Sequence, residues 1–420
     1  MALPMLLFFA LLFPSPKGED PVVSKGLLCH VEALCDPSLE GRMALNPGGR
    51  RAAAYIARAF GEAGLKPLFV EREGDAESTE EGGGFLMKRK VLVHLMDKDI
   101  DIEGEDRVYQ MTPRGLSEEE CFLVVGMIPG RDTKRDDVVL VIARYDGQGR
   151  DGTNVRFPGA DRNASGVAVL IETARALADG GGKVRRTVVF AALPAGESGL
   201  FMRRPAGGAE FERLNNWVVK YLVQSGEWDT FLESKLVRLP GLAGAEAFLA
   251  DSPVPIGEIH TIVDLNMVGG VFGFEKEKDT GDNGDTGDTG EADPAGEEPG
   301  GESGKTPTDG GGVALVGGET GDGLSRTLAK AAAGAKVPVH VLSFREAGER
   351  VDRRFTESCE FLRKKIPCVW ITTGPKVRHG SAADSVDGIV PVQLERSARL
   401  AFRVVKILAN ENASHPFRGF

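Results

Sequence analysis

The sequence lacks an excess of basic residues of the kind that a nucleic-acid-binding surface needs. The 420 residues carry 51 lysines and arginines against 62 aspartates and glutamates, a formal charge of −11. Twelve acidic and three basic residues fall between positions 275 and 309, so the rest of the chain is close to neutral. Because nucleic-acid binding needs a basic face, we expect no nucleic-acid partner.

Long apolar runs are also scarce, and the clearest lies at the amino terminus, where residues 1–13 read MALPMLLFFALLF. This run is too short to cross a bilayer of ~30 Å as a helix, but it suits the apolar region of a signal peptide. No Lys or Arg precedes it and no Ala-x-Ala site follows, so a simple hydrophobic tail is the alternative. We expect a signal peptide at 1–18, an exported protein (secreted, periplasmic or extracytoplasmic) and no other membrane segment.

Cysteine is equally sparse, and its residues could form disulfides only if the protein is exported. The chain has Cys29, Cys35, Cys121, Cys359 and Cys368, an odd number without zinc-knuckle spacing. In an exported protein the first two or the last two could pair, but small buried hydrophobes are the favoured interpretation.

Two Asn-x-Ser patterns, Asn163-Ala-Ser165 and Asn412-Ala-Ser414, match the acceptor for N-linked glycosylation. The match has meaning only in a eukaryotic secretory pathway.

Short apolar runs alternate with helical patterns along most of the chain. The strands predicted from these runs are 138–143, 187–193, 261–265, 313–316, 339–344 and 369–373, after a β-rich stretch at 85–95. The predicted helices are 48–65, 165–178, 324–333 and 392–408. Continuous apolar strands are typical of parallel sheets covered on both faces. We therefore expect one α/β domain over 19–420, with a mostly parallel or mixed central sheet flanked by helices in three layers.

Two segments interrupt this alternation. Residues 201–259 form a long excursion rich in aromatic and charged side chains, which predicts a helical cap over one end of the sheet. Residues 275–312 carry an Asp-x-Gly period and almost no apolar side chains, so we expect a disordered acidic surface loop. Calcium binding by its aspartates is the less favoured alternative.

Six motifs at strand ends, taken in chain order, resemble metallopeptidase family 28. This family of zinc exopeptidases includes bacterial leucyl aminopeptidase, aminopeptidase Y and glutamate carboxypeptidase. The motifs are residues 143–147, 158–166, 186–200, 264–269, 361–367 and 379–384. The resemblance runs from about residue 27 to 410 and implies a zinc-exopeptidase-like (phosphorylase/hydrolase-like) fold.

The resemblance also implies a site of two zinc ions, whose ligand positions are mostly substituted here. The first His ligand falls on Arg144 and the bridging carboxylate on Arg162, while a later aspartate ligand falls on Asn266. The general base falls on Gly196, and only the neighbouring ligand, Glu197, is kept.

Three further residues complete the implied site. Asp146 and Asp161 fit the positions of residues that orient the ligands. His379 stands five residues before Asp384 instead of four, so Gly380 takes the aligned place of the last ligand. We therefore interpret His379 as a loop histidine more readily than as a vestigial ligand.

Chemistry indicates what these substitutions do. Arginine stays protonated and cannot coordinate zinc, and glycine cannot act as a base. Losing a general base alone typically costs ~10²–10⁴-fold in rate. We expect no cofactor, and we hypothesise that Arg144 and Arg162 pair with Glu197, Asp146 and Asp161 in place of metal.

Three functions follow from this pattern. The favoured one is an inactive pseudo-peptidase that uses the fold to bind a protein or peptide in the former active-site cleft. The alternative is an active metal-dependent exopeptidase in which Asp161, Glu197, Asp264 and His379 hold a single zinc ion. The third is metal-free chemistry on an anionic ligand, since two arginines suit a carboxylate or phosphate.

Overall fold

The computed structural model describes most of the chain from Ser24 to Gly419. The described residues are 24–44, 46–68, 84–103, 106–150, 155–181, 183–194, 243–273, 311–348, 356–376, 379 and 381–419. For 24, 25, 90–103, 106–119, 243, 246 and 348 only the backbone is described. The predicted signal peptide and nearly all of the acidic segment lie outside these ranges, as does the predicted cap up to residue 242.

Helices and strands alternate through the described residues. The helices are α1 (Ser24–Leu34), α2 (Pro47–Glu62), α3 (Ser165–Asp179), α6 (Ala243–Ala250), α7 (Leu324–Ala335), α8 (Phe344–Gly348), α9 (Ser358–Arg363) and α10 (Pro391–Asn410). The strands are β1 (Lys66–Pro67), β2 (Leu86–Glu103), β3 (Asp106–Ile128), β4 (Val138–Arg144), β5 (Thr187–Leu193), β6 (Ile259–Leu265), β7 (Val313–Val316), β8 (Val339–Leu342) and β9 (Cys368–Thr372).

The strands form one mixed sheet. Its order is β1-β3-β5-β4-β6-β9-β7-β8, and β2 pairs with β3 outside this path. The central strands β5, β4, β6 and β9 are parallel, so their carboxyl ends share one edge. On either side, β3 and β7 join the parallel group in antiparallel orientation.

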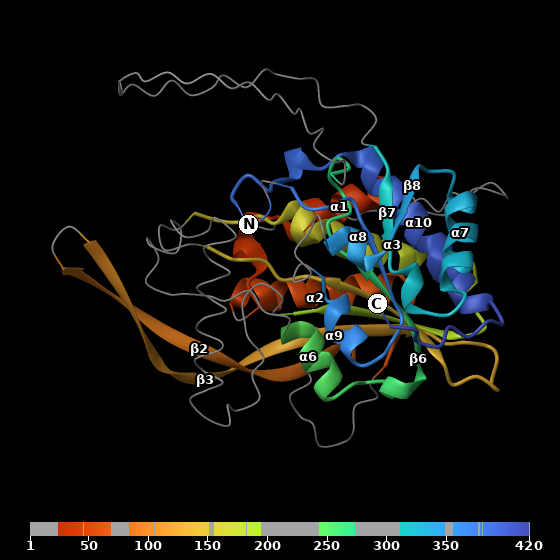
Figure 1. Ribbon diagram of the computed structural model, residues 1–420, viewed down its shortest axis with the longest axis horizontal. Coiled ribbons are helices and arrows are strands. Elements are labelled where there is room, and N and C mark those ends of the chain that lie inside the picture. Colours follow the sequence, from red (N-terminus) through yellow and green to blue (C-terminus); the bar gives the residue numbers. More distant parts are fainter. Residues whose placement is uncertain are drawn as a thin grey trace, which may run out of the picture.

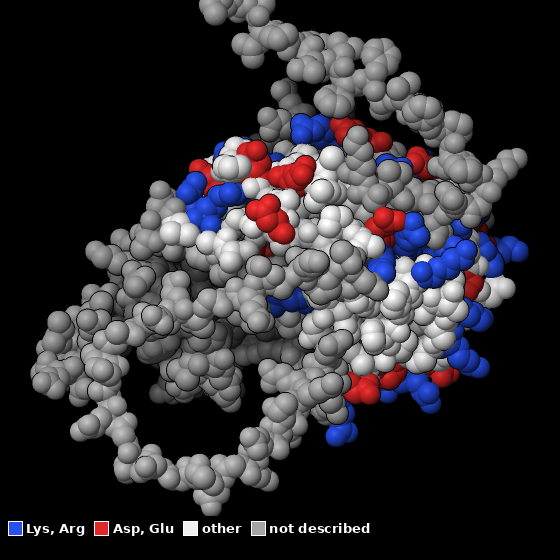
Figure 2. Space-filling model, turned by 90° about the horizontal axis from the view of Figure 1, so that it is seen from above, with Lys and Arg blue, Asp and Glu red and all other residues white. Residues whose placement is uncertain are grey.

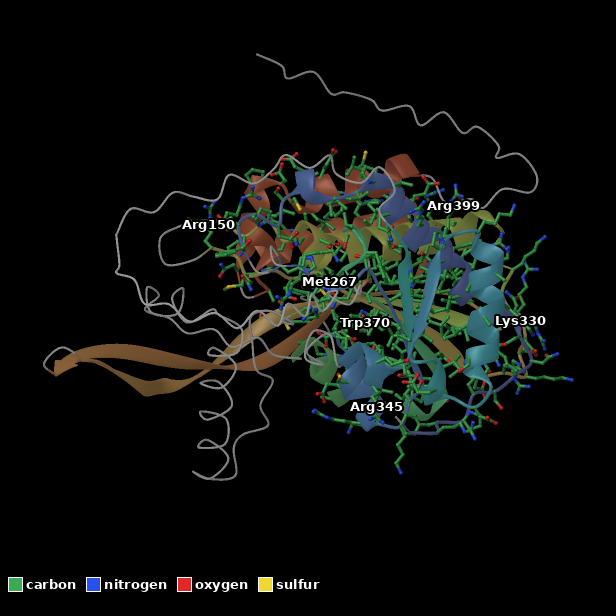
Figure 3. The ribbon with its side chains drawn as sticks, turned by 45° about the horizontal axis from the view of Figure 1, so that its top comes forward. Arg150, Met267, Lys330, Arg345, Trp370 and Arg399 are labelled. Carbon is green, nitrogen blue, oxygen red and sulfur yellow. The ribbon has the colours of Figure 1, made fainter. Side chains whose placement is uncertain are left out.

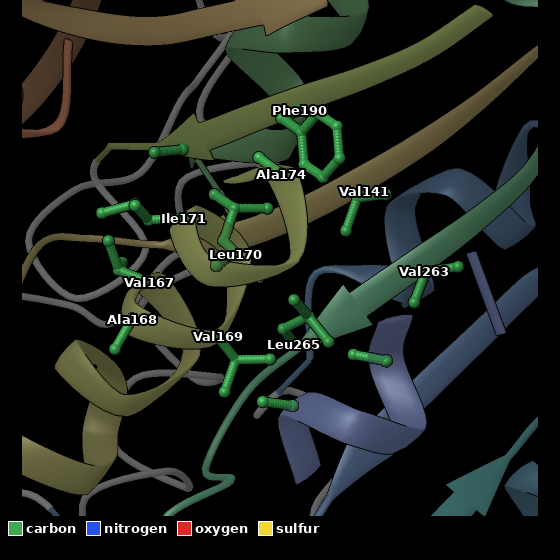
Figure 4. Close-up of a cluster of buried hydrophobic side chains, with 14 of the residues drawn as sticks. Val141, Val167, Ala168, Val169, Leu170, Ile171, Ala174, Phe190, Val263 and Leu265 are labelled. Atoms are coloured by element: carbon green, nitrogen blue, oxygen red, sulfur yellow. The ribbon is translucent and has the colours of Figure 1, made fainter. Parts of the chain in front are cut away.

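Helices cover both faces of the sheet, which gives three layers (Figure 1). On one face α1, α2, α3, α7 and α10 enclose the larger apolar core, and on the other α6, α8 and α9 enclose the smaller one. Helix α3 is apolar on nearly all sides because it is buried between the sheet and its neighbours. Val169 and Leu170 of α3 lie with Val141, Val263 and Leu265 of the central strands (Figure 4).

Strands β2 and β3 continue as a two-stranded ribbon well beyond the sheet, at the left of Figure 1. Their pairing runs from Leu86↔Val124 to Glu103↔Asp106, with one irregularity at Leu95/Met96. On the face seen in Figure 2, acidic and basic side chains are interspersed among other residues.

Among the described residues, no helix has the length and apolar character needed to cross a bilayer.

The α/β fold class predicted from the sequence is confirmed, and the sheet is mixed. Most predicted elements agree with the structure to within two residues, and β5 and β7 have the predicted ends. The strand predicted at 339–344 is shorter, because β8 ends at Leu342 and α8 begins at Phe344. Within the predicted cap, α6 packs Phe248 into the smaller core and β6 starts at Ile259.

Candidate functional site

Polar side chains gather at the carboxyl ends of the parallel strands, which is where open α/β sheets bind ligands. Arg144 is the last residue of β4, and Asn266 directly follows β6. The connection from β4 to α3 contributes Asp161, Arg162 and Asn163, all of them buried.

A buried arginine shapes that connection. Arg42 is fully buried and donates to the carbonyl oxygens of Tyr145 (2.9 Å), Pro158 (2.7 Å) and Gly159 (2.8 Å). Gly159 has φ +59°, and a Cβ there would lie 2.5 Å from the Arg162 carbonyl oxygen. The connection therefore requires glycine at position 159, where a side chain would clash with the backbone. It is also held in place by the hydrogen bonds from the Arg42 guanidinium.

Arg144 lies at the centre of the site, 1% exposed. Its Nε lies 3.6 Å from Oε1 of Glu357, which is fully buried. With its amide oriented so that both ends are satisfied, Asn163 accepts from Arg144 Nε (3.1 Å) and Nη2 (3.3 Å) and donates to Asn266 Oδ1. The Arg144 guanidinium therefore contacts the Glu357 carboxyl group on one side and the Asn163 amide on the other, and the Asn163 amide in turn bonds that of Asn266.

The carboxyl groups near Arg144 are held in a poorly solvated environment. Burial raises the pKa of Glu357 to about 8, against the opposing effect of Arg144, and the charges of Asp264 and Asp146 raise it further. Burial also raises the pKa of Asp264, although hydrogen bonds from Thr356 and Ser358 oppose the shift. Burial disfavours the charged form of a carboxyl group, so near pH 7 Glu357 is mainly protonated.

Asp264 connects the site to the start of α9. Its Oδ2 accepts hydrogen bonds from Thr356 Oγ1 (2.5 Å), Ser358 N (3.2 Å) and Ser358 Oγ (3.0 Å). These bonds fix the backbone on both sides of Glu357, whose Oε2 accepts from Ala245 N (3.2 Å). Asp264 therefore positions Glu357 beside Arg144.

Asp161 pairs with His379. His379 Nε2 lies 2.9 Å from Asp161 Oδ2, and the two side chains are 3% and 0% exposed. Asp161 Oδ1 accepts from Gly269 N (2.8 Å) and Ser165 Oγ (3.1 Å). Burial raises the pKa of Asp161, but hydrogen bonds from His379 and from the Gly269 N–H oppose it, and the net shift is downward.

The same contacts fix the tautomer of His379. The backbone N–H of Lys376 donates to His379 Nδ1 (3.0 Å), so the ring proton is carried by Nε2 and donated to Asp161. Asp384 holds the opposite side of the loop, because its two oxygens accept from Asp161 N (2.9 Å) and Arg162 N (3.0 Å). Both nitrogens of His379 are therefore already engaged within the protein.

The structure brings together most of the residues that sequence reasoning selected. Arg144 and Asn266 meet through Asn163, Asp161 meets His379, and Arg162 and Asp146 are buried. Gly196 and Glu197 lie outside the described residues, so the predicted pairing of Glu197 with an arginine stays a prediction.

Sequence reasoning missed Glu357, the acidic partner that the structure gives to Arg144. Glu357 precedes a short helix in a segment without a motif residue at its position. Only the need to neutralise a buried Arg144 could have signalled such a partner.

The described part of this site does not fit a pair of zinc ions. Within the described ranges, no group of three or more His, Cys, Asp or Glu side chains could hold a metal ion. At the strand ends themselves, Arg144 brings a permanent positive charge and Asn163 and Asn266 bring neutral amides. Zinc instead requires neutral imidazole, thiolate or carboxylate donors.

Comparison with known proteins identifies the family. The model of peptidase family M28 matches residues 124–405, which contain every element of the parallel sheet. The chain belongs to peptidase family M28. A comparison with curated proteins returned no match.

Solved structures share the M28 fold at low sequence identity. BSAP, a zinc aminopeptidase from Bacillus subtilis, has a TM-score of 0.55 at 11% identity, over 95% of this chain and 99% of that chain. An aminopeptidase from Aneurinibacillus gives 0.54 at 11% identity, over 95% and 98%. A glutaminyl cyclase from an Acidobacteriales bacterium gives 0.51 at 14% identity, over 95% and 99%. These similarities concern the fold alone.

Proposed function

We propose that this chain is a non-catalytic member of peptidase family M28, whose fold binds a peptide or protein at the carboxyl ends of its parallel strands. The observation that carries the proposal is Arg144. It stands where the resemblance places the first zinc ligand, and it pairs there with Glu357 and bonds Asn163.

The charge of Arg144 takes over one task of a metal ion. In the resembled site, two zinc ions balance a group of carboxylates. Here a guanidinium provides a fixed positive charge near Glu357, Asp264 and Asp146, and the raised pKa of Glu357 reduces the negative charge further. The site is held together by the protein's own groups, so its assembly has no need of metal.

The alternative, an active exopeptidase with a single metal, requires these contacts to break. Asp161 would have to release His379, and His379 would have to give up the Lys376 N–H or Asp161 to expose a lone pair. Gly196 supplies no side chain at the position of the base.

Metal content and turnover separate these two functions. We expect purified protein to contain less than stoichiometric zinc and to leave aminoacyl-arylamides and dipeptides unhydrolysed, whether or not a chelator is present. Hydrolysis that a chelator abolishes and zinc restores would overturn the proposal in favour of the exopeptidase.

A restoring variant tests whether the substitutions themselves removed the chemistry. Combining Arg144→His, Arg162→Asp, Gly196→Glu and Asn266→Asp returns the resembled ligands and base. We expect this variant to bind zinc where the wild-type chain does not. The matched control keeps Arg144 and carries the other three changes, and it should bind less zinc because the guanidinium still repels the metal.

Binding at the strand ends is tested with peptides of defined length. We expect peptides that bind the wild-type protein to lose affinity when Arg162, which lies in the loop after β4, is changed to Ala. Arg150→Met, at an exposed position of the same connection, serves as the control. If the Arg162→Ala and Arg150→Met proteins bound the peptides equally well, the carboxyl ends of the strands would not be the binding site.

Export is part of the same proposal and is supported by the apolar run at residues 1–13. A cleaved amino terminus on protein recovered from outside the producing cytoplasm would support it. Retention of the intact chain inside the cell would contradict it.

A further inference from the structure

The two Asn-x-Ser patterns occupy opposite environments in the fold. We propose that Asn412 is modified by N-linked glycosylation and that Asn163 is not. This inference rests on the proposed export and concerns a chain that is exported through a eukaryotic secretory pathway, and it goes beyond the binding role of the strand ends.

Asn163 lies inside the candidate site. It is 0% exposed, and its amide bonds Arg144 on one side and Asn266 on the other. The hydroxyl of its pattern, Ser165 Oγ, is also buried and donates to the carbonyl oxygen of Asp161 (2.7 Å). A sugar on this amide would break these contacts and has no space between α3 and the sheet, so a folded chain carries none at Asn163.

Asn412 lies on the surface, two residues after the end of α10. Both Asn412 and Ser414 are exposed, and the segment between them is not helical. Arg185 donates to Asn412 Oδ1, and Arg135 donates to its carbonyl oxygen (3.2 Å). These bonds engage the two oxygens, whereas the sugar attaches to Nδ2.

The position of Asn412 keeps a glycan away from the candidate site. Arg135 and Arg185 precede β4 and β5, and His260 near the start of β6 lies 3.2 Å from the Ala413 carbonyl oxygen. The segment around Asn412 therefore crosses the amino ends of the parallel strands. The candidate site is at their carboxyl ends, and a seven-residue strand such as β4 spans roughly 20 Å. A glycan at Asn412 thus leaves the strand carboxyl ends open.

The chemistry requires only the usual donor of that pathway, a lipid-diphosphate-linked oligosaccharide. A bond forms between Asn412 Nδ2 and the anomeric carbon of the first sugar, and the bond from that carbon to the diphosphate oxygen breaks. The lipid diphosphate leaves with the electron pair, and the amide gives up one proton to the transferase. The asparagine side chain remains a neutral amide.

The test uses the full chain expressed in eukaryotic secretory cells, both with its own amino terminus and behind an added cleavable secretion leader. Folded protein is treated with an N-glycosidase that converts glycosylated Asn to Asp, and peptides containing each asparagine are analysed by mass spectrometry. Asn412→Gln and Ser414→Ala are the test variants, and Asn410→Gln on the last turn of α10 is the control.

We expect conversion at Asn412 and none at Asn163 in both forms of the chain. Gel mobility should shift by one glycan in the wild type and in the control, and in neither test variant. An unmodified Asn412 in leader-driven protein, or a glycan on Asn163 of folded protein, would overturn the assignment. A glycan at Asn412 only with the added leader would overturn natural modification and contradict export, but it would leave the proposed binding site untouched.

Discussion

At the scale of single residues, Arg144 places a permanent positive charge among buried carboxyl and amide groups. A buried guanidinium is costly to desolvate, and this cost is offset only where carboxyl groups and hydrogen-bond acceptors surround it. Glu357, Asp264 and Asn163 provide that environment here. Removing the arginine alone would leave buried polar groups without their partner.

We therefore predict that Arg144→Met destabilises the fold by about 1–3 kcal/mol, the usual cost of leaving a buried polar group such as the Asn163 amide without its partner. The free energy of unfolding from urea denaturation measures this change. Arg150→Met is the matched control, and because Arg150 is exposed we expect a change within about 0.5 kcal/mol. Figure 3 shows Arg150 at the periphery of the molecule and Met267 in its interior. A stable Arg144→Met protein would show that the pair does not support the fold.

Glu357 gives a second prediction, which concerns pH. Its folded pKa of about 8 lies above the unfolded value of ~4.3, so the folded protein holds a proton that the unfolded chain releases. Folding stability attributable to this group is therefore highest below the unfolded pKa, falls as pH rises toward 8, and is constant above it.

Glu357→Gln removes this titration. We expect the variant to gain stability relative to wild type between about pH 5 and 8, by on the order of a few kcal/mol, as urea denaturation across that range would show. Glu395→Gln, at a surface pair on α10, is the control and should follow the wild-type curve. A difference that does not change with pH would mean that Glu357 is ionised in the folded protein.

The sequence motifs located the residues of the candidate site but not the contacts that these residues make. Arg144, Arg162 and Asn266 could be located because they stand in motifs of fixed spacing. Glu357 and Asn163 could not be assigned as partners of Arg144, because a contact between residues so far apart depends on how α9 and the loop after β4 meet in space. His379, a loop histidine by its sequence, lies against Asp161 because the segment after β9 closes on the site.

At the scale of elements, the contact between α3 and β6 is close because a glycine lies between them. A Cβ on Gly166 would approach the Leu265 carbonyl oxygen to 2.3 Å, a distance that only backbone movement could relieve. The close approach lets Ser165 Oγ accept from Val268 N (3.2 Å), which ties the first turn of α3 to the residues after β6.

We predict that Gly166→Ala costs about 1–3 kcal/mol, as overpacking typically does, and disturbs the strand ends as well. Gly257→Ala is the control, since nothing lies within 4 Å of a Cβ there. The measurements are the unfolding free energy and the amide exchange rate at Gly269, which donates to Asp161. If Gly166→Ala destabilised the protein but left the exchange rate at Gly269 unchanged, the close packing of α3 on β6 would not control the geometry of the site.

Element prediction succeeded where periodicity was unambiguous. The continuous apolar runs of β4, β5 and β7 have no competing interpretation, and α10 has a regular apolar face. Of the ribbon, only the first part of β2 was predicted, as the β-rich stretch 85–95, and β3 was not predicted. Most of the ribbon is not apolar, and its pairing comes from the partner strand. Strand β8 was extended too far because Phe344, an apolar residue, belongs to the following helix.

At the scale of the whole molecule, two apolar cores, one on each face of the sheet, hold the described fold together. A protein stabilised by a ligand loses that contribution when the ligand is removed. We predict that the midpoint of thermal unfolding is the same in a strong chelator, in buffer and in added zinc.

Differential scanning calorimetry measures this midpoint directly. BSAP, described as a zinc aminopeptidase and similar to this chain in fold, is a suitable comparison under the same conditions. A fall of several degrees in chelator would reveal a structural metal and contradict the replacement of zinc by Arg144.

The C-terminal segment has a consequence for synthesis. Arg186, buried at the start of β5, donates to the carbonyl oxygens of Leu408, Glu411 and Ala413, more than 200 residues later. While the chain is still emerging from the ribosome, the last of these acceptors remain in the exit tunnel. Of the partners named in the fold, the guanidinium then has only Asp137, which precedes it in the chain. The parallel sheet therefore cannot close its amino-terminal edge until after translation has passed α10. Co-translational folding should stall at an intermediate with β5 incompletely buried.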